Sequence, residues 1–254
     1  MVICHIGGYA EFVAVPAQHA LTVPDDFSFE EAACIPWNYL VAHYLIFRVA
    51  CVRPGERVLV HAAGSGVGTA TVQLLNTIPG TVLFATASAL KHEALHAMGC
   101  RHAINYRAVD YAKEIRRLTD GEGVDVVLDS LGGGDWRKGY DLLRPSGRMV
   151  AFGIANIMTG ERRKPLPIIR ELLRMPRFSP LQLIETNRSV AGVSTGRLWT
   201  NPQVLVESLK GAFQLCRQHG IRPRVDSVHT FEQVAAAHRR IVERKNIGRV
   251  ILVP

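Results

Sequence analysis

Residues 57–75 read RVLVHAAGSGVGTATVQLL, an apolar run followed by a glycine-rich turn and a second apolar stretch. The run at 57–61 predicts a buried strand, and residues 66–77 predict a helix. Small residues let the backbone turn tightly and approach a phosphate, while the helix start offers N–H groups and the positive end of its dipole. Gly64, Gly66 and Gly68 do not reproduce the spacing G-x-G-x-x-G, so a ligand-free turn is the alternative. The strand–turn–helix context favours nucleotide binding.

On both sides of this turn the chain alternates between short apolar runs and helical patterns. Apolar runs bounded by Gly and Pro are typical of strands buried on both faces of a parallel sheet. Strands joined by helices form right-handed βαβ units, which predicts an α/β fold with a Rossmann-like doubly wound parallel sheet. The predicted strands are 7–15, 57–61, 81–86, 102–105, 124–128, 148–152, 189–194 and 248–253, and the predicted helices are 28–50, 66–77, 88–98, 109–118, 135–143, 203–218 and 231–244.

Composition excludes several classes of protein. The chain has 254 residues, 48% hydrophobic and 20% charged, which rules out a disordered or collagen-like chain. Aromatic residues are only 7%, so aliphatic side chains must form most of the core. The longest apolar stretch, 35–52, contains Asn38, His43 and Arg48, which a membrane span tolerates poorly. The capping box Ser28-x-x-Glu31 precedes it, so we expect a buried helix.

The formal net charge of +8 is unevenly distributed, with arginines concentrated at 161–177 and 216–249. A basic surface can attract nucleic acid, anionic lipid or a phosphorylated cofactor. The sequence contains no recognised nucleic-acid module, so we expect a solvated basic face and no nucleic-acid partner.

The cysteines are scattered and odd in number, and they form no C-x-x-C pair. This pattern favours reduced thiols in a cytoplasmic enzyme and offers no zinc-binding spacing. We expect each thiol to be a small buried apolar group. The five residues are Cys4, Cys34, Cys51, Cys100 and Cys216.

The end of the second predicted strand indicates which nucleotide binds. Sites for NAD or S-adenosylmethionine usually place a carboxylate there, on the ribose hydroxyls. Here the segment 85–88 reads ATAS and contains no carboxylate, and Lys91 lies three positions after Ser88. Ser88 and Lys91 suit a 2′-phosphate, which predicts NADPH and disfavours a methyltransferase; the alternative is that Lys91 is a solvated lysine. A charge-assisted hydrogen bond of about 1.5–3 kcal/mol would favour NADPH about tenfold to hundredfold.

Five longer motifs together resemble one known family. They are GGYAEF at 7–12, FSFEEAACIPWNYLVAH at 27–43, ATASALKHEAL at 85–95, DSLGGGDWRKGYDLLRPSGRMVAFGIANIMTGERR at 129–163 and KNIGRVILVP at 245–254. With HAAGSGVG, they resemble the zinc-independent quinone oxidoreductase branch of the medium-chain dehydrogenase/reductases, closest to the vesicle amine transport protein group. The resemblance covers essentially the whole chain, and the combination is specific.

The resemblance implies a Rossmann-like nucleotide domain and an incomplete, N-terminally shortened GroES-like β substrate domain. Residues 1–27 and 222–254 would belong to the substrate domain, and 28–221 would form the nucleotide domain with an inserted lid at about 154–188. The family often forms homodimers by pairing edge strands, and 189–194 is the candidate edge here.

The resemblance also implies the cofactor-binding residues. The backbone of the glycine turn would hold the pyrophosphate, and Ser65 stands where a glycine is usual. Tyr106 would lie near the 2′-phosphate and adenosine, or it is a plain packed aromatic residue. Val41 stands where the family often has Thr, and Trp37 stands where zinc-dependent relatives have a cysteine ligand, so no metal is expected. The full set is Asn38, Gly64, Ser65, Gly66, Val67, Gly68, Ser88, Lys91, Tyr106, Ser130, Phe152, Gly153 and Asn246.

By this resemblance the protein is an NADPH-dependent reductase of a quinone or an α,β-unsaturated carbonyl. The cofactor supplies the hydride, and the protein supplies orientation and excludes water. His43, His61 and His92 are possible proton donors, but each is better explained as a structural histidine, so no catalytic residue is named. The alternative is a catalytically impaired scaffold that binds a partner or an anionic membrane through the basic segment 161–177.

Overall fold

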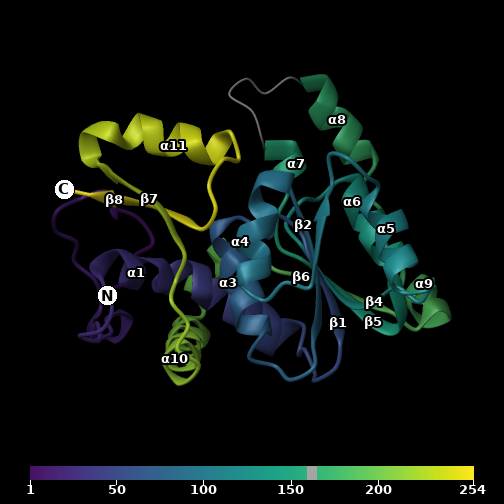
Figure 1. Cartoon of the computed structure of the whole chain (residues 1–254), viewed down its shortest axis with the longest axis horizontal. Coiled ribbons are helices and arrows are strands. Elements are labelled where there is room, and N and C mark those ends of the chain that lie inside the picture. The colour runs from purple at the N-terminus through teal and green to yellow at the C-terminus, as the bar shows by residue number, and fades with distance from the viewer. Residues whose placement is uncertain (159–164) are drawn as a thin grey trace. The chain divides into compact units, whose positions relative to one another are not determined.

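The computed structural model describes residues 1–158 and 165–254. It divides the chain into two compact units (Figure 1). The first unit contains residues 1–44, 64–77 and 195–254, and the second contains residues 45–63 and 78–194. The predicted domain boundaries, which follow the family resemblance, stay a prediction.

The second unit is built on a parallel sheet of six strands in the order β3-β2-β1-β4-β5-β6. Each pair is in parallel register; for example, Leu59 of β1 pairs with Phe84 of β2 and with Val127 of β4. The central strands are apolar and buried because both faces of the sheet are covered, which confirms the predicted α/β fold class. The strands are β1 (Arg57–Val60), β2 (Val82–Ala87), β3 (His102–Asn105), β4 (Val124–Asp129), β5 (Leu143–Ala151) and β6 (Ser189–Gly192).

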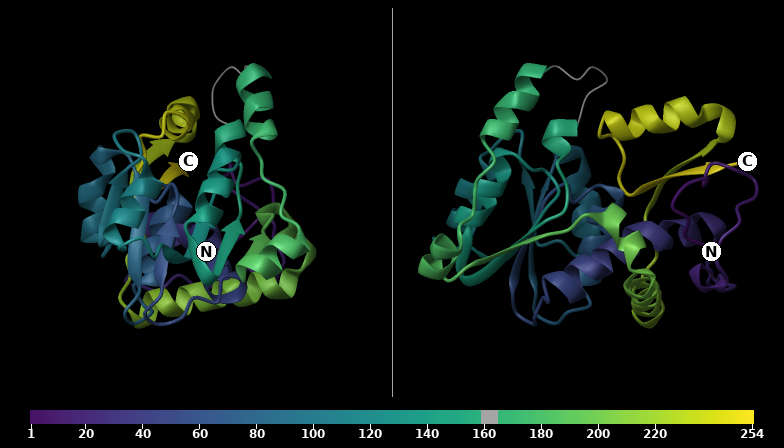
Figure 2. Two further views of the ribbon diagram at one scale, coloured as in Figure 1. Left: turned by 90° about the vertical axis from the view of Figure 1, so that its right-hand side faces the viewer. Right: turned by 180° about the vertical axis from the view of Figure 1, so that it is seen from behind.

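Helices connect the strands of the second unit, and Figure 2 shows α5 and α6 along one face of the sheet. Ile115 of α5 and Tyr140 of α6 pack with Leu59, Phe84 and Met149 in a buried core. Burying one such side chain stabilises the fold by about 1.5–3 kcal/mol. The helical segments of this unit are η4 (Ala89–Lys91), α4 (His92–Ala97), α5 (Tyr111–Leu118), α6 (Gly134–Asp141), α7 (Ala155–Met158), α8 (Pro165–Leu173) and α9 (Pro180–Thr186).

The first unit is mainly helical. The Ser28 hydroxyl accepts the N–H of Glu31, and the Glu31 carboxylate accepts the N–H of Ser28, so the capping box is confirmed. The following helix alternates between α and π turns as α1 (Phe29–Cys34), η2 (Ile35–Tyr39), α2 (Leu40–His43) and η3 (Tyr44–Val49), the last of which runs into the second unit. Its other elements are η1 (Ala17–His19), α3 (Gly66–Leu75), η5 (Thr195–Thr200), α10 (Pro202–Gln218), β7 (Val225–Thr230), η6 (Phe231–Gln233), α11 (Val234–Val242) and β8 (Arg249–Val253).

One predicted strand is wrong, and one strand of the structure was not predicted. Residues 7–15 do not form the predicted strand, because none of the described strands pairs with them and Gly7 has a φ of +86°. β7, which pairs in parallel with β8, was not predicted from the sequence. The segment Val225–Thr230 carries Asp, Ser and His among its few apolar residues, so its pattern is weak.

The predicted lid at 154–188 contains α7, α8 and α9. Its most basic stretch, with Glu161, Arg162, Arg163 and Lys164, lies outside the described residues.

Candidate functional site

The glycine-rich turn begins α3, as predicted. Ser65 is the N-cap residue, and its hydroxyl accepts the N–H of Gly68 at 3.1 Å. A Cβ atom on Gly66 would lie 2.5 Å from Nδ2 of Asn38, so no larger residue fits without moving that amide. The turn therefore places the backbone of Gly66 directly against Asn38, and the start of a ten-residue helix beside it.

Asn38 lies in the π-helical turn η2 and is only 3% exposed. Its Oδ1 accepts a hydrogen bond from Nη1 of Arg249 at 3.2 Å. Arg249 was not among the predicted site residues, because it lies in the closing strand 211 positions further along and carries no local signal of this contact. The pair brings a guanidinium to the side chain that packs on the glycine turn.

The segment before β8 also reaches this turn. The N–H of Gly248 donates to the carbonyl of Gly64 at 3.2 Å, and the amide of Asn246 donates to the carbonyl of Gly248 at 2.9 Å. Asp226 of β7 accepts the N–H of Ile247 at 2.7 Å. Burial would raise the pKa of Asp226, but hydrogen bonds, above all from Arg240, outweigh it and lower that pKa.

The structure therefore gathers the part of the predicted set that belongs to the first unit. Asn38, the turn and Asn246 are linked by the contacts described above, and Asn246 is buried like Asn38.

The second unit holds the residues predicted near the 2′-phosphate. Ala87 of β2 pairs with Asn105 of β3, so Ser88 and Tyr106 leave neighbouring strands at the same edge of the sheet. Lys91 follows Ser88 in a tight turn in which its N–H donates to the Ser88 carbonyl, and the side chain is buried with 8% exposure. Tyr106 is 38% exposed, and the guanidinium carbon of Arg107 lies 5.8 Å from its ring centre.

The loops that follow β4 and β5 hold the remaining predicted residues. Asp129 pairs with Ala151, and the N–H of Phe152 donates to the carbonyl of Asp129 at 2.8 Å. A Cβ on Gly153 would lie 2.6 Å from the carbonyl oxygen of Ser130, so these two loops lie backbone against backbone. The structure brings Ser130, Phe152 and Gly153 together.

The three histidines considered as proton donors make structural contacts. His61 is buried at the end of β1, with Nδ1 2.9 Å from Oγ1 of Thr86. His43 packs against Gly211 of α10 so closely that a Cβ there would clash with its ring. Nε2 of His92 lies 3.4 Å from the carbonyl of Ala87. Each of the three imidazoles thus has a contact within the fold, and the catalytic acid stays unassigned.

The thiols follow the sequence prediction only in part. Burial raises the pKa of Cys34 and Cys216 to about 12 and that of Cys100 to about 11, as expected for small apolar groups. Cys51 is exposed, because it lies in the loop after η3, where its φ is +48°.

Trp37 stacks on Trp199 with ring centres 6.5 Å apart. In the ranges 1–158 and 165–254, no cluster of three or more His, Cys, Asp or Glu side chains could hold a metal ion. The absence of zinc stays a prediction.

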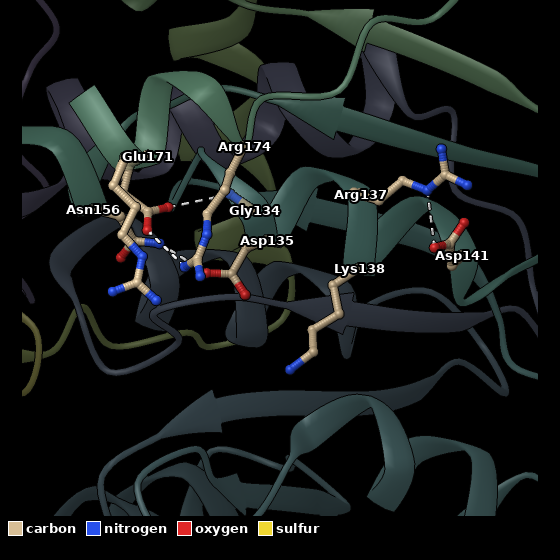
Figure 3. Close-up of a pocket in the computed structure, with 9 residues that line it drawn as sticks. Gly134, Asp135, Arg137, Lys138, Asp141, Asn156, Glu171 and Arg174 are labelled. Atoms are coloured by element: carbon tan, nitrogen blue, oxygen red, sulfur yellow. Dashed lines mark hydrogen bonds and ion pairs between the residues drawn. The ribbon is translucent and has the colours of Figure 1, made fainter. Parts of the chain in front are cut away.

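A cavity of about 1070 Å³ in the second unit is lined by α6, Asn156 and α8 (Figure 3). The Glu171 carboxylate accepts the N–H of Gly134 at 3.2 Å, which attaches α8 to the start of α6. Glu171 also pairs with Arg174, three positions further along the chain, at 3.3 Å. This cavity could not be predicted from the sequence, because α6 and α8 are separated in the chain. Its lining mixes basic residues (Arg137, Lys138, Arg170 and Arg174) with acidic ones (Asp135, Asp141 and Glu171).

The strand order 3-2-1-4-5-6 and the glycine turn after β1 define a class, the Rossmann-like dinucleotide-binding proteins. A family model described as zinc-binding dehydrogenase matches residues 98–252. The chain belongs to this family of oxidoreductases, within the medium-chain dehydrogenase/reductase superfamily.

The relatives refine this placement. The chain is 41% identical over 254 residues to the human synaptic vesicle membrane protein VAT-1 homolog, covering 100% of this chain and 64% of that protein. A quinone oxidoreductase from Pseudomonas syringae superimposes with a TM-score of 0.80 at 27% identity, covering 98% of this chain and 72% of the other. A mycobacterial protein in complex with NADPH superimposes with a TM-score of 0.80 at 27% identity, covering 98% of this chain and 73% of the other.

The chain spans 52% to 64% of the length of the first three VAT-1 relatives that it matches. No helix within the described ranges is long and apolar enough to cross a membrane.

Proposed function

We propose that the protein is an NADPH-dependent oxidoreductase that transfers a hydride to a quinone or an α,β-unsaturated carbonyl compound. The observation that carries this proposal is the close approach of Asn38 to Gly66 at the start of α3. The N–H groups there suit the pyrophosphate of a dinucleotide, and Arg249 adds a positive charge close to the turn through its bond to Asn38. The bound cofactor supplies the hydride; the side chains described here bind and orient it.

The preference for NADPH rests on the edge formed by β2 and β3. β2 ends in Ala87 and is followed by Ser88, where an NAD site usually has a carboxylate. Lys91 and Arg107 bring two positive charges to the loops that leave these two strands. A 2′-phosphate gains charge-assisted hydrogen bonds in such surroundings, whereas a ribose hydroxyl gains little.

We infer that the reaction does not use a metal ion bound by protein side chains. Trp37 stands where zinc-dependent relatives carry a cysteine, and it packs against Trp199. The reaction would then proceed without zinc to polarise the carbonyl of the acceptor. The proton that completes the reduction can come from water. The cytoplasmic location also remains part of the proposal.

Turnover tests the reaction class. The chain should oxidise NADPH only when a quinone or an enone is present, with one acceptor reduced for each NADPH consumed. Saturable NADPH binding without oxidation by either class of acceptor would contradict hydride transfer and leave a binding protein.

A homodimer is the proposed assembly. β6 is the last strand in the sheet order, so one of its edges is open in the single chain. Edge strands of this kind are templates for pairing with another chain. Ser189–Gly192 of two copies would then extend the sheet.

A second candidate function is binding to an anionic membrane surface, and the orientation of α8 favours it. The face with Glu171 and Arg174 is directed to α6, whereas Ile169, Leu172 and Leu173 on the other face are 52%, 51% and 82% exposed. An apolar helix face beside basic residues is typical of helices that lie in the membrane interface. Arg170, within this helix, adds further positive charge.

Sedimentation with liposomes tests this candidate. The chain should pellet with anionic vesicles at low salt and much less at high salt, because the Debye length falls from about 30 Å at 0.01 M to about 10 Å at 0.1 M. Exchanging both Leu172 and Leu173 for Ser should abolish pelleting, while Leu90→Ser, at a site 92% exposed elsewhere, should not. Equal pelleting of all three proteins, or none at any salt, would exclude α8 as a membrane contact.

A further inference from the structure

A buried polar network links the ends of the three central strands of the sheet. β1 lies between β2 and β4, and His61, Thr86 and Asp129 are at or next to their carboxyl ends. Nδ1 of His61 lies 2.9 Å from Oγ1 of Thr86, and its Nε2 lies 3.7 Å from Oδ2 of Asp129. All three residues are at most 2% exposed. The imidazole therefore bonds to the end of β2 and lies beside the carboxylate at the end of β4, at a separation longer than a hydrogen bond.

The other carboxylate oxygen of Asp129 holds the loop after β4. Oδ1 accepts the N–H of Leu131 at 2.6 Å and that of Gly132 at 3.1 Å. Gly132 has a φ of +78°, and a Cβ on it would lie 3.0 Å from the Cα of Ile154. The carboxylate thus fixes a tight loop that starts at Ser130 and packs against the loop after β5.

Burying a carboxylate and an imidazole in the core of a sheet costs desolvation free energy. Burial raises the pKa of Asp129, which the nearby imidazole and the two backbone N–H groups partly offset. The ring of Tyr111 packs edge-on against His61 with ring centres 4.8 Å apart, and its hydroxyl donates to Asp135 at 2.8 Å. Apolar residues of similar volume would pack there at lower cost, so the polar groups need another explanation.

We propose that Asp129 and His61 are positioning residues for the cofactor: they hold the loops after β2 and β4 in the conformation in which Ser88 and Ser130 receive it. This inference rests on the proposed function. Neither side chain touches the cofactor; Asp129 acts through the backbone of residues 130–132, and His61 acts through Thr86, two positions before Ser88.

Variants of Asp129 separate positioning from packing. Asp129→Ala removes the carboxylate oxygen that accepts both backbone N–H groups, and it should weaken NADPH binding about tenfold or more. Asp129→Asn keeps a carbonyl oxygen for the two N–H groups, so its dissociation constant should stay within about threefold. Thr86→Val replaces the hydroxyl that contacts His61 by a methyl group of similar size, and it should weaken NADPH binding about fivefold. This variant keeps the inference testable if Asp129→Ala fails to fold.

Asp125 provides a matched control on the same strand. It accepts the N–H of Arg57 at 2.8 Å and a bond from Arg144 at 3.3 Å, but it lies at the opposite end of β4. Asp125→Ala should lower the melting temperature without changing NADPH affinity. The inference would be overturned if Asp129→Ala or Thr86→Val bound NADPH as tightly as Asp125→Ala does. Packing alone would then account for the network.

Amide hydrogen exchange in the cofactor-free chain keeps this test separate from the proposed function. The N–H groups of Leu131 and Gly132 should exchange faster in Asp129→Ala and not in Asp129→Asn, with Asp125→Ala unchanged at both positions. If the wild-type chain binds no dinucleotide, the proposed function fails and the cofactor role of the network fails with it. If NADPH binds but exchange at both positions is the same in all variants, only the positioning role is overturned.

Discussion

Replacing Gly66 with alanine is expected to weaken NADPH binding about tenfold to hundredfold. The added methyl group would lie 2.5 Å from Nδ2 of Asn38, well inside van der Waals contact. Overpacking of this kind typically costs about 1–3 kcal/mol. Asn38 is buried and bonded to Arg249, so it can move away only by giving up that bond. Titration of the variant with NADPH, followed by tryptophan fluorescence, measures the loss.

Gly196 is the matched control for this substitution. It belongs to the same unit, and a Cβ on it would have no heavy atom within 4 Å. Gly196→Ala should therefore bind NADPH like the wild type. Unchanged NADPH affinity in the Gly66 variant, with a melting temperature like that of the control, would show that the cofactor does not use the turn at the start of α3.

Loss of the Lys91 charge is expected to weaken NADPH binding about tenfold to hundredfold and to leave NADH binding nearly unchanged. Only NADPH carries the 2′-phosphate that we assign to Ser88 and Lys91. Because Lys91 is largely buried, Lys91→Met is the better variant: it keeps most of the aliphatic stem and its packing while removing the ammonium. Paired titrations with NADPH and NADH give the change in the ratio of the two dissociation constants.

Lys113 serves as the control, since it is an exposed lysine of α5 in the same unit. Lys113→Met should change neither dissociation constant. An equal loss of affinity for both dinucleotides in Lys91→Met would reject the 2′-phosphate assignment and point to a role of Lys91 in folding.

The features predicted from sequence are those with a local signal. The strand, glycine turn and helix at 57–75 follow from an apolar run, three small residues and a helical pattern, and the structure has β1 and α3 there. The capping box at Ser28 and Glu31 is equally local. The predicted strand at 7–15 was wrong because a strand needs a partner, and its pattern carries no information about one.

The contacts that complete the site join residues far apart in the chain. Arg249 reaches Asn38, and His61 lies beside Asp129, only because the fold brings separate strands and turns together. An arginine in a closing strand and an aspartate at a strand end look ordinary in sequence. The family resemblance supplied Asn246 and Tyr106, whereas composition and spacing pointed only to the glycine turn, Ser88 and Lys91.

Titration of the wild-type chain with NADPH and with NADH tests the central claim most directly. Binding can be followed by quenching of tryptophan fluorescence, from Trp37, Trp136 and Trp199, and by enhanced nicotinamide emission. We expect saturable binding of NADPH with a dissociation constant about tenfold or more below that for NADH. Binding of neither dinucleotide, or equal binding of both, would contradict an NADPH-dependent oxidoreductase.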